Sequence, residues 1–218
     1  TLQSRNLVGD FKWTTNLNIA FNRNEITQMG TNNTPKGGYS NQEDFNRLAV
    51  GEPIGIFMGY IFDGVYMTEE ELNSQPKHAS SEIGTVRMKD VSGPNGVPDG
   101  IIDNNDRVKI GDPNPDFIYG MTNEFSWKNF DLSVLFQGAA DSWTKVYWEA
   151  GDIGNYPKYV YDKHWSIENP SSLYPRVNER SAYYWDGTAA GNNTYWMVNT
   201  NYIRLKNLEL GWTLPKAW

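Results

Sequence analysis

The stretch DFIYGMTNEFSWKNFDLSVLFQG, Asp116–Gly138, decides the fold. On both sides of Lys128-Asn129 apolar side chains recur at alternate positions: Phe117, Tyr119, Met121, Phe125 and Trp127 before it, and Phe130, Leu132, Val134 and Phe136 after it. Because successive side chains of a strand point to opposite faces, this pattern predicts two strands joined by a two-residue turn. Trp127 then lies opposite Phe130, and both apolar rows share one face. A shift of one residue in either strand would destroy that agreement.

Two further segments predict long strands. Alternation across Phe11–Asn22 predicts a strand over residues 10–23, with Phe, Trp, Leu and Ile on one face and Lys and Asn on the other. The closing segment, residues 201–214, reverses its parity at Lys206-Asn207. This reversal is either a second two-residue turn or a β-bulge. We favour the bulge, because the part before the reversal is too short to pair with the part after it.

The connection over residues 24–115 contains weaker signals. Residues 29–50 are polar and rich in Gly, which predicts a loop. Residues 51–67 carry Gly, aromatic and β-branched residues without clean alternation, so they predict buried extended structure or two short strands. Residues 68–75 are interpreted either as a helical turn capped by Thr68, with three Glu near its positive end, or as a solvated acidic segment.

A second long connection, residues 140–200, is rich in Trp, Tyr, Asn and Gly and contains no Phe. A short helix is expected within residues 156–166. Tyr and Trp without Phe favour half-wet surfaces, where the ring packs and its OH or NH bonds outward. These rings either stack on a sugar or peptide, or pack the connection onto itself. The substrate-binding candidates are Trp143, Trp148, Trp165, Tyr184, Trp185 and Trp196.

Composition limits the function. Among 218 residues, 39% are hydrophobic, mean hydropathy is −0.64, and no run of 18 apolar residues is present. The sequence therefore excludes a membrane-spanning helix but not a spanning strand. A net charge of −7 argues against a nucleic-acid partner, and the absence of Cys excludes disulfides and Cys-ligated zinc. No nucleophile elbow, phosphate loop or fixed carboxylate pair is present, so we expect no enzyme. Neither end resembles a domain border, and we expect an excerpt of a longer protein.

The segment DVSGPNGVPDGIIDNND, residues 90–106, has two interpretations, of which one is a calcium site; the other requires no cofactor. From Asp99 onward its spacing matches the second half of a calcium loop, with the Ile101 carbonyl as a further ligand. The first half is irregular, and Asp90 joins the site if residues 94–98 bulge out as an insertion. The alternative is an acidic turn stabilised by Asx hydrogen bonds, without metal. The candidate ligands are Asp90, Asp99, Asp103 and Asp106.

Several phrases together resemble the SusC/RagA family of TonB-dependent outer-membrane transporters of Bacteroidetes. They are GEPIGIFMGYIFDGVY (51–66), DGIIDNNDRVKIGDPNPDFIYG (99–120), NEFSWKNFDLSVLFQG (123–138) and YIRLKNLELGWTLP (202–215), in family order. The family usually carries a compact D-V-N-G-D-G, where this sequence has Asp90-Val91-Ser92-Gly93, five extra residues and then Asp99-Gly100. This departure weakens the transfer of a metal site and leaves Asp103 and Asp106 matching.

The resemblance implies an all-β chain that forms a late part of a 22-stranded antiparallel transmembrane β-barrel with long extracellular loops. It also implies import of oligosaccharide or peptide across the outer membrane, a SusD-like surface lipoprotein as partner, and energy from the TonB complex through parts without a counterpart here. The expected strands are residues 10–23, 116–127, 130–139 and 201–214, with extracellular loops at 24–115 and 140–200. The apolar faces would meet outer-membrane lipid, and Lys128-Asn129 would be periplasmic.

Two other functions remain open from the sequence. The first is a soluble carbohydrate-binding β-sandwich module with a structural calcium, in which the apolar rows would face a second sheet. That arrangement needs comparable strands within 140–200, and the pattern does not predict them. The second, weaker alternative is an accessory domain of a glycosidase.

Overall fold

The computed structural model describes residues 1–30, 33, 36–37, 46–79, 81–146, 157–177 and 192–215. The chain divides into two compact units. Unit 1 comprises Thr1–Arg23, Asn114–Trp143 and Asn199–Trp218, and unit 2 comprises Asn24–Pro113 and Thr144–Val198. The two long connections predicted from the sequence thus fold together as unit 2. No helix among the described residues is long and apolar enough to cross a membrane.

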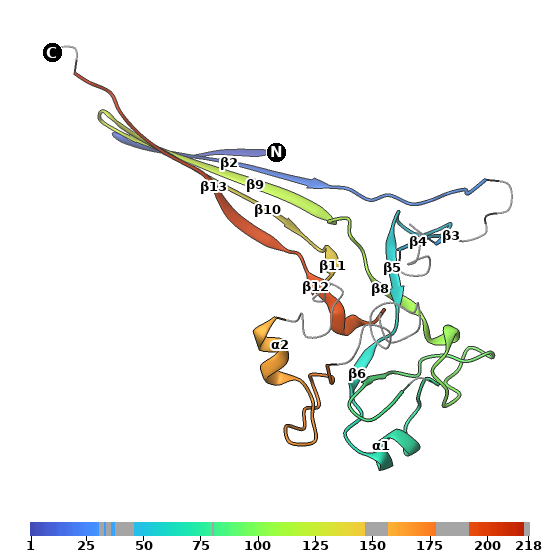
Figure 1. Cartoon of the computed structure of the whole chain (residues 1–218). Helices are drawn as coiled ribbons and strands as arrows, with labels where there is room; N and C mark the ends of the chain where they lie inside the picture. Colours follow the sequence, from blue (N-terminus) through green and yellow to red (C-terminus); the bar gives the residue numbers. More distant parts are fainter. Residues whose placement is uncertain are drawn as a thin grey trace. The chain divides into compact units, whose positions relative to one another are not determined.

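Unit 1 is a five-stranded sheet in which every pair of neighbours is antiparallel, in the order β1-β2-β9-β10-β13 (Figure 1). Its strands are β1 (Leu2–Val8), β2 (Phe11–Phe21), β9 (Phe117–Trp127), β10 (Phe130–Ala140) and β13 (Tyr202–Trp212). The sheet therefore brings together three parts of the chain that lie far apart in sequence. The prediction of an all-β, antiparallel fold is confirmed.

The register of the β9–β10 hairpin is the predicted one. Trp127 pairs with Phe130 across the two-residue turn, and the pairing continues without a shift to Phe117 and Ala140. Lys128 begins the turn with φ +54°, in the left-handed region that a tight reversal requires. Both apolar rows therefore lie on one face of the sheet.

A β-bulge, as favoured from the sequence, explains the parity reversal near the end of the chain. Leu135 pairs with Asn207 and the next residue, Phe136, pairs with Leu205, so Lys206 is the extra residue in β13. The segment is one continuous strand, not a hairpin. Because the bulge shifts the phase by one residue, the apolar residues before and after Lys206 fall on the same face of the sheet.

β1 is a strand that the alternation did not predict. Its pairing with β2 shifts between Arg5 and Leu7, which makes Asn6 an extra, bulged residue. Leu2 pairs with Leu17 and Leu7 with Trp13, so both leucines lie on the apolar face. In a strand of seven residues, the bulge hides the period-2 pattern from inspection of the sequence.

Unit 2 is built from short strands. A four-stranded sheet has the order β3-β4-β5-β8, and β6 pairs with β7. A further pair, β11 with β12, lies where the chain passes between the units. These strands are β3 (Lys36–Gly37), β4 (Asn46–Leu48), β5 (Ile56–Gly59), β6 (Phe62–Val65), β7 (Val86–Met88), β8 (Val108–Gly111), β11 (Trp143–Lys145) and β12 (Met197–Asn199). The segment 51–67 therefore forms two short strands, and neither joins the five-stranded sheet.

The helices of unit 2 are short. The α-helix α1 (Glu69–Ser74) begins at Thr68, whose side chain accepts a hydrogen bond from the Glu71 N–H at 3.2 Å, as expected for the capped helical turn. The second α-helix, α2 (Lys158–Lys163), lies within the predicted segment. The described part of unit 2 also includes the 3₁₀ turns η1 (Asn104–Asp106) and η4 (Thr194–Trp196).

Unit 2 is made of two excursions of the chain, Asn24–Pro113 and Thr144–Val198, which are joined by backbone hydrogen bonds. The Tyr60 N–H donates to the Asn192 carbonyl at 2.8 Å, and the Thr194 N–H donates to the Tyr60 carbonyl at 3.0 Å. Tyr60 also belongs to a buried cluster with Val86, Met88 and Ile102. Unit 2 thus has an apolar core of its own, which the interpretation of residues 24–115 and 140–200 as loops did not foresee.

Candidate functional site

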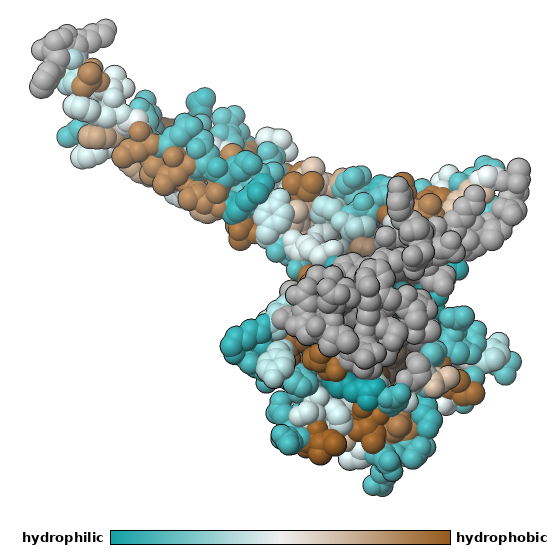
Figure 2. Space-filling model, viewed as in Figure 1, coloured by the Kyte–Doolittle hydropathy of each residue, from teal (hydrophilic) through white to brown (hydrophobic). Residues whose placement is uncertain are grey.

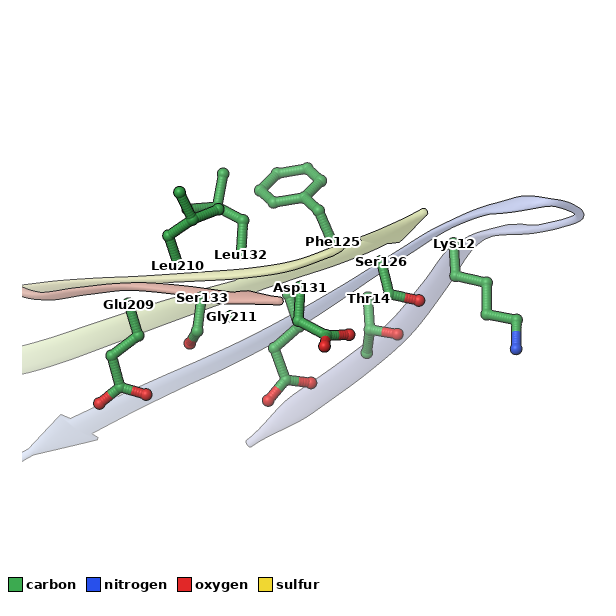
Figure 3. Close-up of a pocket in the computed structure, with 11 residues that line it drawn as sticks. Lys12, Thr14, Phe125, Ser126, Asp131, Leu132, Ser133, Glu209, Leu210 and Gly211 are labelled. Carbon is green, nitrogen blue, oxygen red and sulfur yellow. The ribbon is translucent and has the colours of Figure 1, made fainter. Parts of the chain in front are cut away.

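The five-stranded sheet of unit 1 has two chemically different faces. Figure 3 shows Phe125, Leu132 and Leu210 on one side of the strands and Asp131 and Glu209 on the other. The strand registers extend this division across the sheet, because residues paired across neighbouring strands point to the same face. We call the two sides the apolar face and the polar face.

The apolar face carries an aromatic row at the end where the β9–β10 hairpin turns. Phe11 pairs with Trp127, Trp127 with Phe130, and Phe130 with Trp212, so one ring from each of four neighbouring strands lies at the same level. The Phe130 and Trp212 rings stack with centroids 6.3 Å apart. The four side chains are 43–58% exposed. Such a row at one level is the pattern that places aromatic rings at a membrane–water boundary.

Beyond the aromatic row, the apolar face continues along β13. Ile203, Leu205, Leu208 and Leu210 are 51–76% exposed. Figure 2 shows hydrophobic residues gathered along this sheet. A contiguous exposed apolar surface of this kind marks a face that meets a partner or a lipid rather than water.

A small polar network interrupts the apolar face midway along β9. Asn123 Oδ1 accepts hydrogen bonds from Trp13 Nε1 at 3.0 Å and from Thr15 Oγ1 at 2.7 Å. Asn6 Nδ2, on the bulge of β1, donates to Thr15 Oγ1 at 2.8 Å. These polar groups thus satisfy one another, which lowers the cost of placing them on an apolar surface.

The polar face is hollowed near the hairpin turn, with a volume of about 650 Å³. Glu124, Asp131 and Glu209 bring three carboxylates to its lining, and Lys12 brings an ammonium group. Gly211, which pairs with Asp131, adds no side chain there. This face is therefore acidic and hydrogen-bonding, suited to a polar or cationic neighbour. The polar lining residues are Lys12, Thr14, Glu124, Ser126, Asp131, Ser133 and Glu209.

The acidic segment of unit 2 uses its side chains mainly on its own backbone. Asp106, fully buried, accepts hydrogen bonds from the N–H groups of Val91, Ser92 and Asp103 at 2.8–3.1 Å. Asp90 Oδ2 accepts from the Gly100 N–H at 2.6 Å.

The other two acidic candidates also hold local turns. Asp99 Oδ1 accepts from the Ile101 N–H, and Asp103 Oδ1 accepts from the Asn105 N–H. Among the described residues, no three His, Cys, Asp or Glu side chains are grouped as a metal site requires. The calcium site therefore stays a prediction.

The substrate-binding candidates have different surroundings. Trp143, in β11, is partly exposed. Trp196 is 5% exposed and meets Tyr195 edge-on at 4.6 Å. The Trp165 ring lies against Gly84, where a Cβ atom would come within 2.3 Å of it. The other three candidates lie outside the described residues: Trp148, Tyr184 and Trp185.

Sequence reasoning missed a buried lysine in β11. Lys145 is 8% exposed, its Nζ donates to Asn192 Oδ1 at 2.8 Å, and burial lowers its pKa to about 8. Burial likewise raises the pKa of Tyr195 to about 12, so its hydroxyl stays protonated near neutrality. A lone Lys in a short strand gives no sequence signal of burial.

Comparison with known proteins gives a consistent set of relatives. The chain is 30% identical to TonB-dependent receptor P3 and 29% identical to TonB-dependent receptor P26, both of Formosa agariphila, over 100% and 94% of its length. It is 22% identical over 96% of its length to TonB-dependent receptor SusC of Bacteroides thetaiotaomicron. The chain spans 19–21% of the length of these relatives. No protein-family profile matches it.

Solved structures agree with these sequence relatives. The RagAB peptide transporter matches 99% of this chain with a TM-score of 0.70 at 17% identity, and the chain covers 22% of that structure's chain. The RagAB peptide importer in its open-open state matches with a TM-score of 0.68. At this identity the likeness shows the fold: the chain is built like part of a RagA-type β-barrel.

Proposed function

From its similarity to a segment of SusC/RagA-type TonB-dependent receptors, which sequence and fold both show, we propose that this chain forms part of an outer-membrane β-barrel that imports nutrients. The imported solute is an oligosaccharide or a peptide. The role of the protein is transport rather than catalysis, and the TonB complex delivers the energy through other parts of the whole protein.

The observation that carries this proposal is the contrast between the two faces of the five-stranded sheet. A strand that crosses a bilayer satisfies its backbone through its neighbours, shows lipid an apolar face and shows the barrel interior a polar one. The strands β2, β9 and β10 each have one apolar and one polar face. The bulge at Lys206 keeps the apolar residues of β13 on the same face as theirs. The aromatic row at the hairpin end then marks the periplasmic boundary.

A charge placed on the apolar face tests the proposal. Val134 lies midway along β10, paired with Asn123 and Leu208. We expect Val134→Arg to lower the free energy of unfolding of the full-length protein in lipid vesicles by about 2–4 kcal/mol, because the guanidinium would enter the hydrocarbon layer. Urea titration followed by Trp fluorescence measures this difference.

Ser133→Arg is the matched control. Ser133 is the preceding residue in β10, lies on the polar face, and pairs with Glu124 and Glu209. An arginine there meets carboxylates and water, so its effect should stay within about 0.5 kcal/mol. Equal effects of the two substitutions would contradict the assignment of the apolar face to lipid.

We extend the proposal to the partners. A SusD-like surface lipoprotein would cover the extracellular mouth, and aromatic side chains of the segment 140–200 would contact the solute. Of the described candidates, Trp143 and Trp165 are partly exposed, and Trp143 begins the strand β11. Reduced uptake by Trp143→Ala with normal assembly of the barrel would support this contact.

Calcium binding by the acidic segment also remains our proposal. Its support is Asp90 Oδ1, which is buried and accepts no hydrogen bond among the described residues. Asp99, Asp103 and Asp106 would complete the ligand set after local rearrangement, because their oxygens now hold backbone N–H groups. Titration of Ca²⁺ while the melting temperature of the full-length protein is recorded tests this binding.

The soluble β-sandwich alternative is less consistent with the structure. In a sandwich, the apolar face would be the buried inner face of one sheet. Here Leu208, Leu210 and Trp212 on that face are 58–76% exposed. A full-length protein that stays monodisperse without detergent would nevertheless favour the sandwich over the barrel.

A further inference from the structure

The apolar face contains a shallow groove beside the aromatic row, with a volume of about 280 Å³. Its walls come from β2, β9, β10 and β13, and they are almost entirely apolar. The side chains that form them are Phe11, Phe125, Trp127, Phe130, Leu132 and Leu210. A groove of this size accommodates several methylene groups of an extended hydrocarbon chain.

A cation stands at the end of this groove. Lys128, the first residue of the hairpin turn, is exposed, and its Nζ lies 4.7 Å from the centroid of the Trp127 ring. The ring therefore holds the ammonium group beside the aromatic row rather than over the polar face. The turn itself is fixed, because the Thr213 N–H donates to the Asn129 carbonyl at 2.8 Å.

A carboxylate lies on the adjacent turn. Gly9 and Asp10 join β1 to β2, and the pairing of Phe11 with Trp127 sets this turn beside Lys128-Asn129. Asp10 is exposed. This end of the sheet thus carries one positive and one negative side chain on neighbouring turns, and Lys128 lies over a ring that lines the groove.

We propose that this end of the sheet binds one aminophospholipid, with an acyl chain in the groove, the phosphate on Lys128 and the headgroup ammonium facing Asp10. This inference rests on the membrane assignment proposed above and specifies the lipid. A lipid with a net negative headgroup would meet repulsion from Asp10, and a detergent without charge would leave both side chains unused. An ammonium–phosphate hydrogen bond at a bilayer boundary is charge-assisted and strong.

Lipid retention by the purified full-length protein tests the proposal. The probe is phosphatidylethanolamine, added in excess in mild detergent and then diluted, with bound copies counted by native mass spectrometry. We expect Lys128→Gln to weaken retention about tenfold, since it removes one charge-assisted contact. Leu210→Trp, which fills the groove and leaves Lys128 in place, should reduce retention as well.

Lys12→Gln is the matched control. Lys12 lies at the same end of the sheet, paired with Ser126, but on the polar face. The Lys12→Gln substitution should leave the retention of phosphatidylethanolamine unchanged. Equal loss in the Lys12 and Lys128 variants, or equal retention by Lys128→Gln and the unaltered protein, would overturn the proposal. Equal retention of phosphatidylglycerol would overturn the role given to Asp10.

The outcome for this lipid is separable from the outcome for the barrel. Heat-modifiable migration of each variant on gels shows whether the full-length protein is folded in the membrane. A membrane-inserted protein that retains phosphatidylethanolamine equally in all variants refutes the lipid site alone. A protein absent from the membrane fraction refutes the proposed function itself.

Discussion

Lys145 places an ammonium group in the interior of unit 2, with Asn192 Oδ1 as a hydrogen-bond acceptor 2.8 Å away. The backbone carbonyl of Asn192 also accepts a hydrogen bond from the Tyr60 N–H. By bonding the Asn192 side chain, Lys145 therefore stabilises the junction between the two excursions. Burial lowers the pKa of Lys145 from 10.5 to about 8. Burial thus penalises the protonated amine, which still predominates at pH 7 but loses its proton in the folded protein at a lower pH than in the unfolded chain.

This shift gives a pH dependence with a definite sign. Between pH 8 and 10.5 the unfolded chain holds more protons on Lys145 than the folded chain, so stability rises with pH in that window and levels off above it. The full shift corresponds to an upper limit of about 3 kcal/mol. We expect the melting temperature of the full-length protein, relative to that of Lys145→Gln, to increase from about pH 8 to about pH 10. A difference in melting temperature that stays constant over this pH range would contradict burial of Lys145 with a lowered pKa.

At the scale of single elements, the bulge in β13 determines which side chains the strand shows to each face. Lys206 is the extra residue opposite Leu135 and Phe136. If Lys206 instead took a regular position opposite Phe136, Leu205 would pair with Gln137, and Ile203 and Leu205 would turn to the polar face. The bulge therefore allows one strand to combine two apolar segments of opposite parity.

Deletion of Lys206 tests this role. The deletion removes the extra residue, so Leu205 directly precedes Asn207 and still pairs with Phe136, and the apolar side chains of β13 alternate without a break on the apolar face. We expect normal assembly of the full-length protein, seen as unchanged heat-modifiable migration and an unchanged yield in the outer-membrane fraction. Lys206→Ala keeps the extra residue and should assemble normally. Impaired assembly of the deletion variant alone would show that the bulge does more than bring the two apolar segments into phase.

The elements also show what sequence reasoning can reach. The register of the β9–β10 hairpin was predictable, because alternation on both sides of a two-residue turn permits one register. β1 was not, because the bulge at Asn6 breaks its alternation within seven residues. Asp106 illustrates a different limit: its spacing matches a calcium ligand, yet its oxygens hold three backbone N–H groups, which depends on a turn that spacing does not specify.

At the scale of the whole molecule, the chain combines the five-stranded sheet of unit 1 with a unit 2 that has an apolar core of its own. The joint between the two excursions of unit 2 involves Gly84, which has φ +83° and lies against the Trp165 ring. The Arg176 N–H donates to the Gly84 carbonyl at 2.8 Å, and the Arg176 guanidinium also bonds Glu82. None of these contacts could be derived from composition or spacing, because they depend on backbone conformation and tertiary packing.

If the two units are energetically separate, a lesion at this joint should leave the five-stranded sheet intact. Gly84→Ala places a methyl group within 2.3 Å of Trp165 and strains a left-handed backbone, which should cost unit 2 roughly 1–3 kcal/mol. We expect faster proteolysis within residues 157–177 and reduced solute uptake, with unchanged heat-modifiable migration of the full-length protein. Gly96→Ala is the matched control, since Gly96 has φ +75° and no neighbour within 4 Å, so it carries the strain without the clash. Equal proteolysis of the two variants would show that the contact between Gly84 and Trp165 does not join the two excursions. Loss of heat-modifiable migration in Gly84→Ala would show that the two units fold as one.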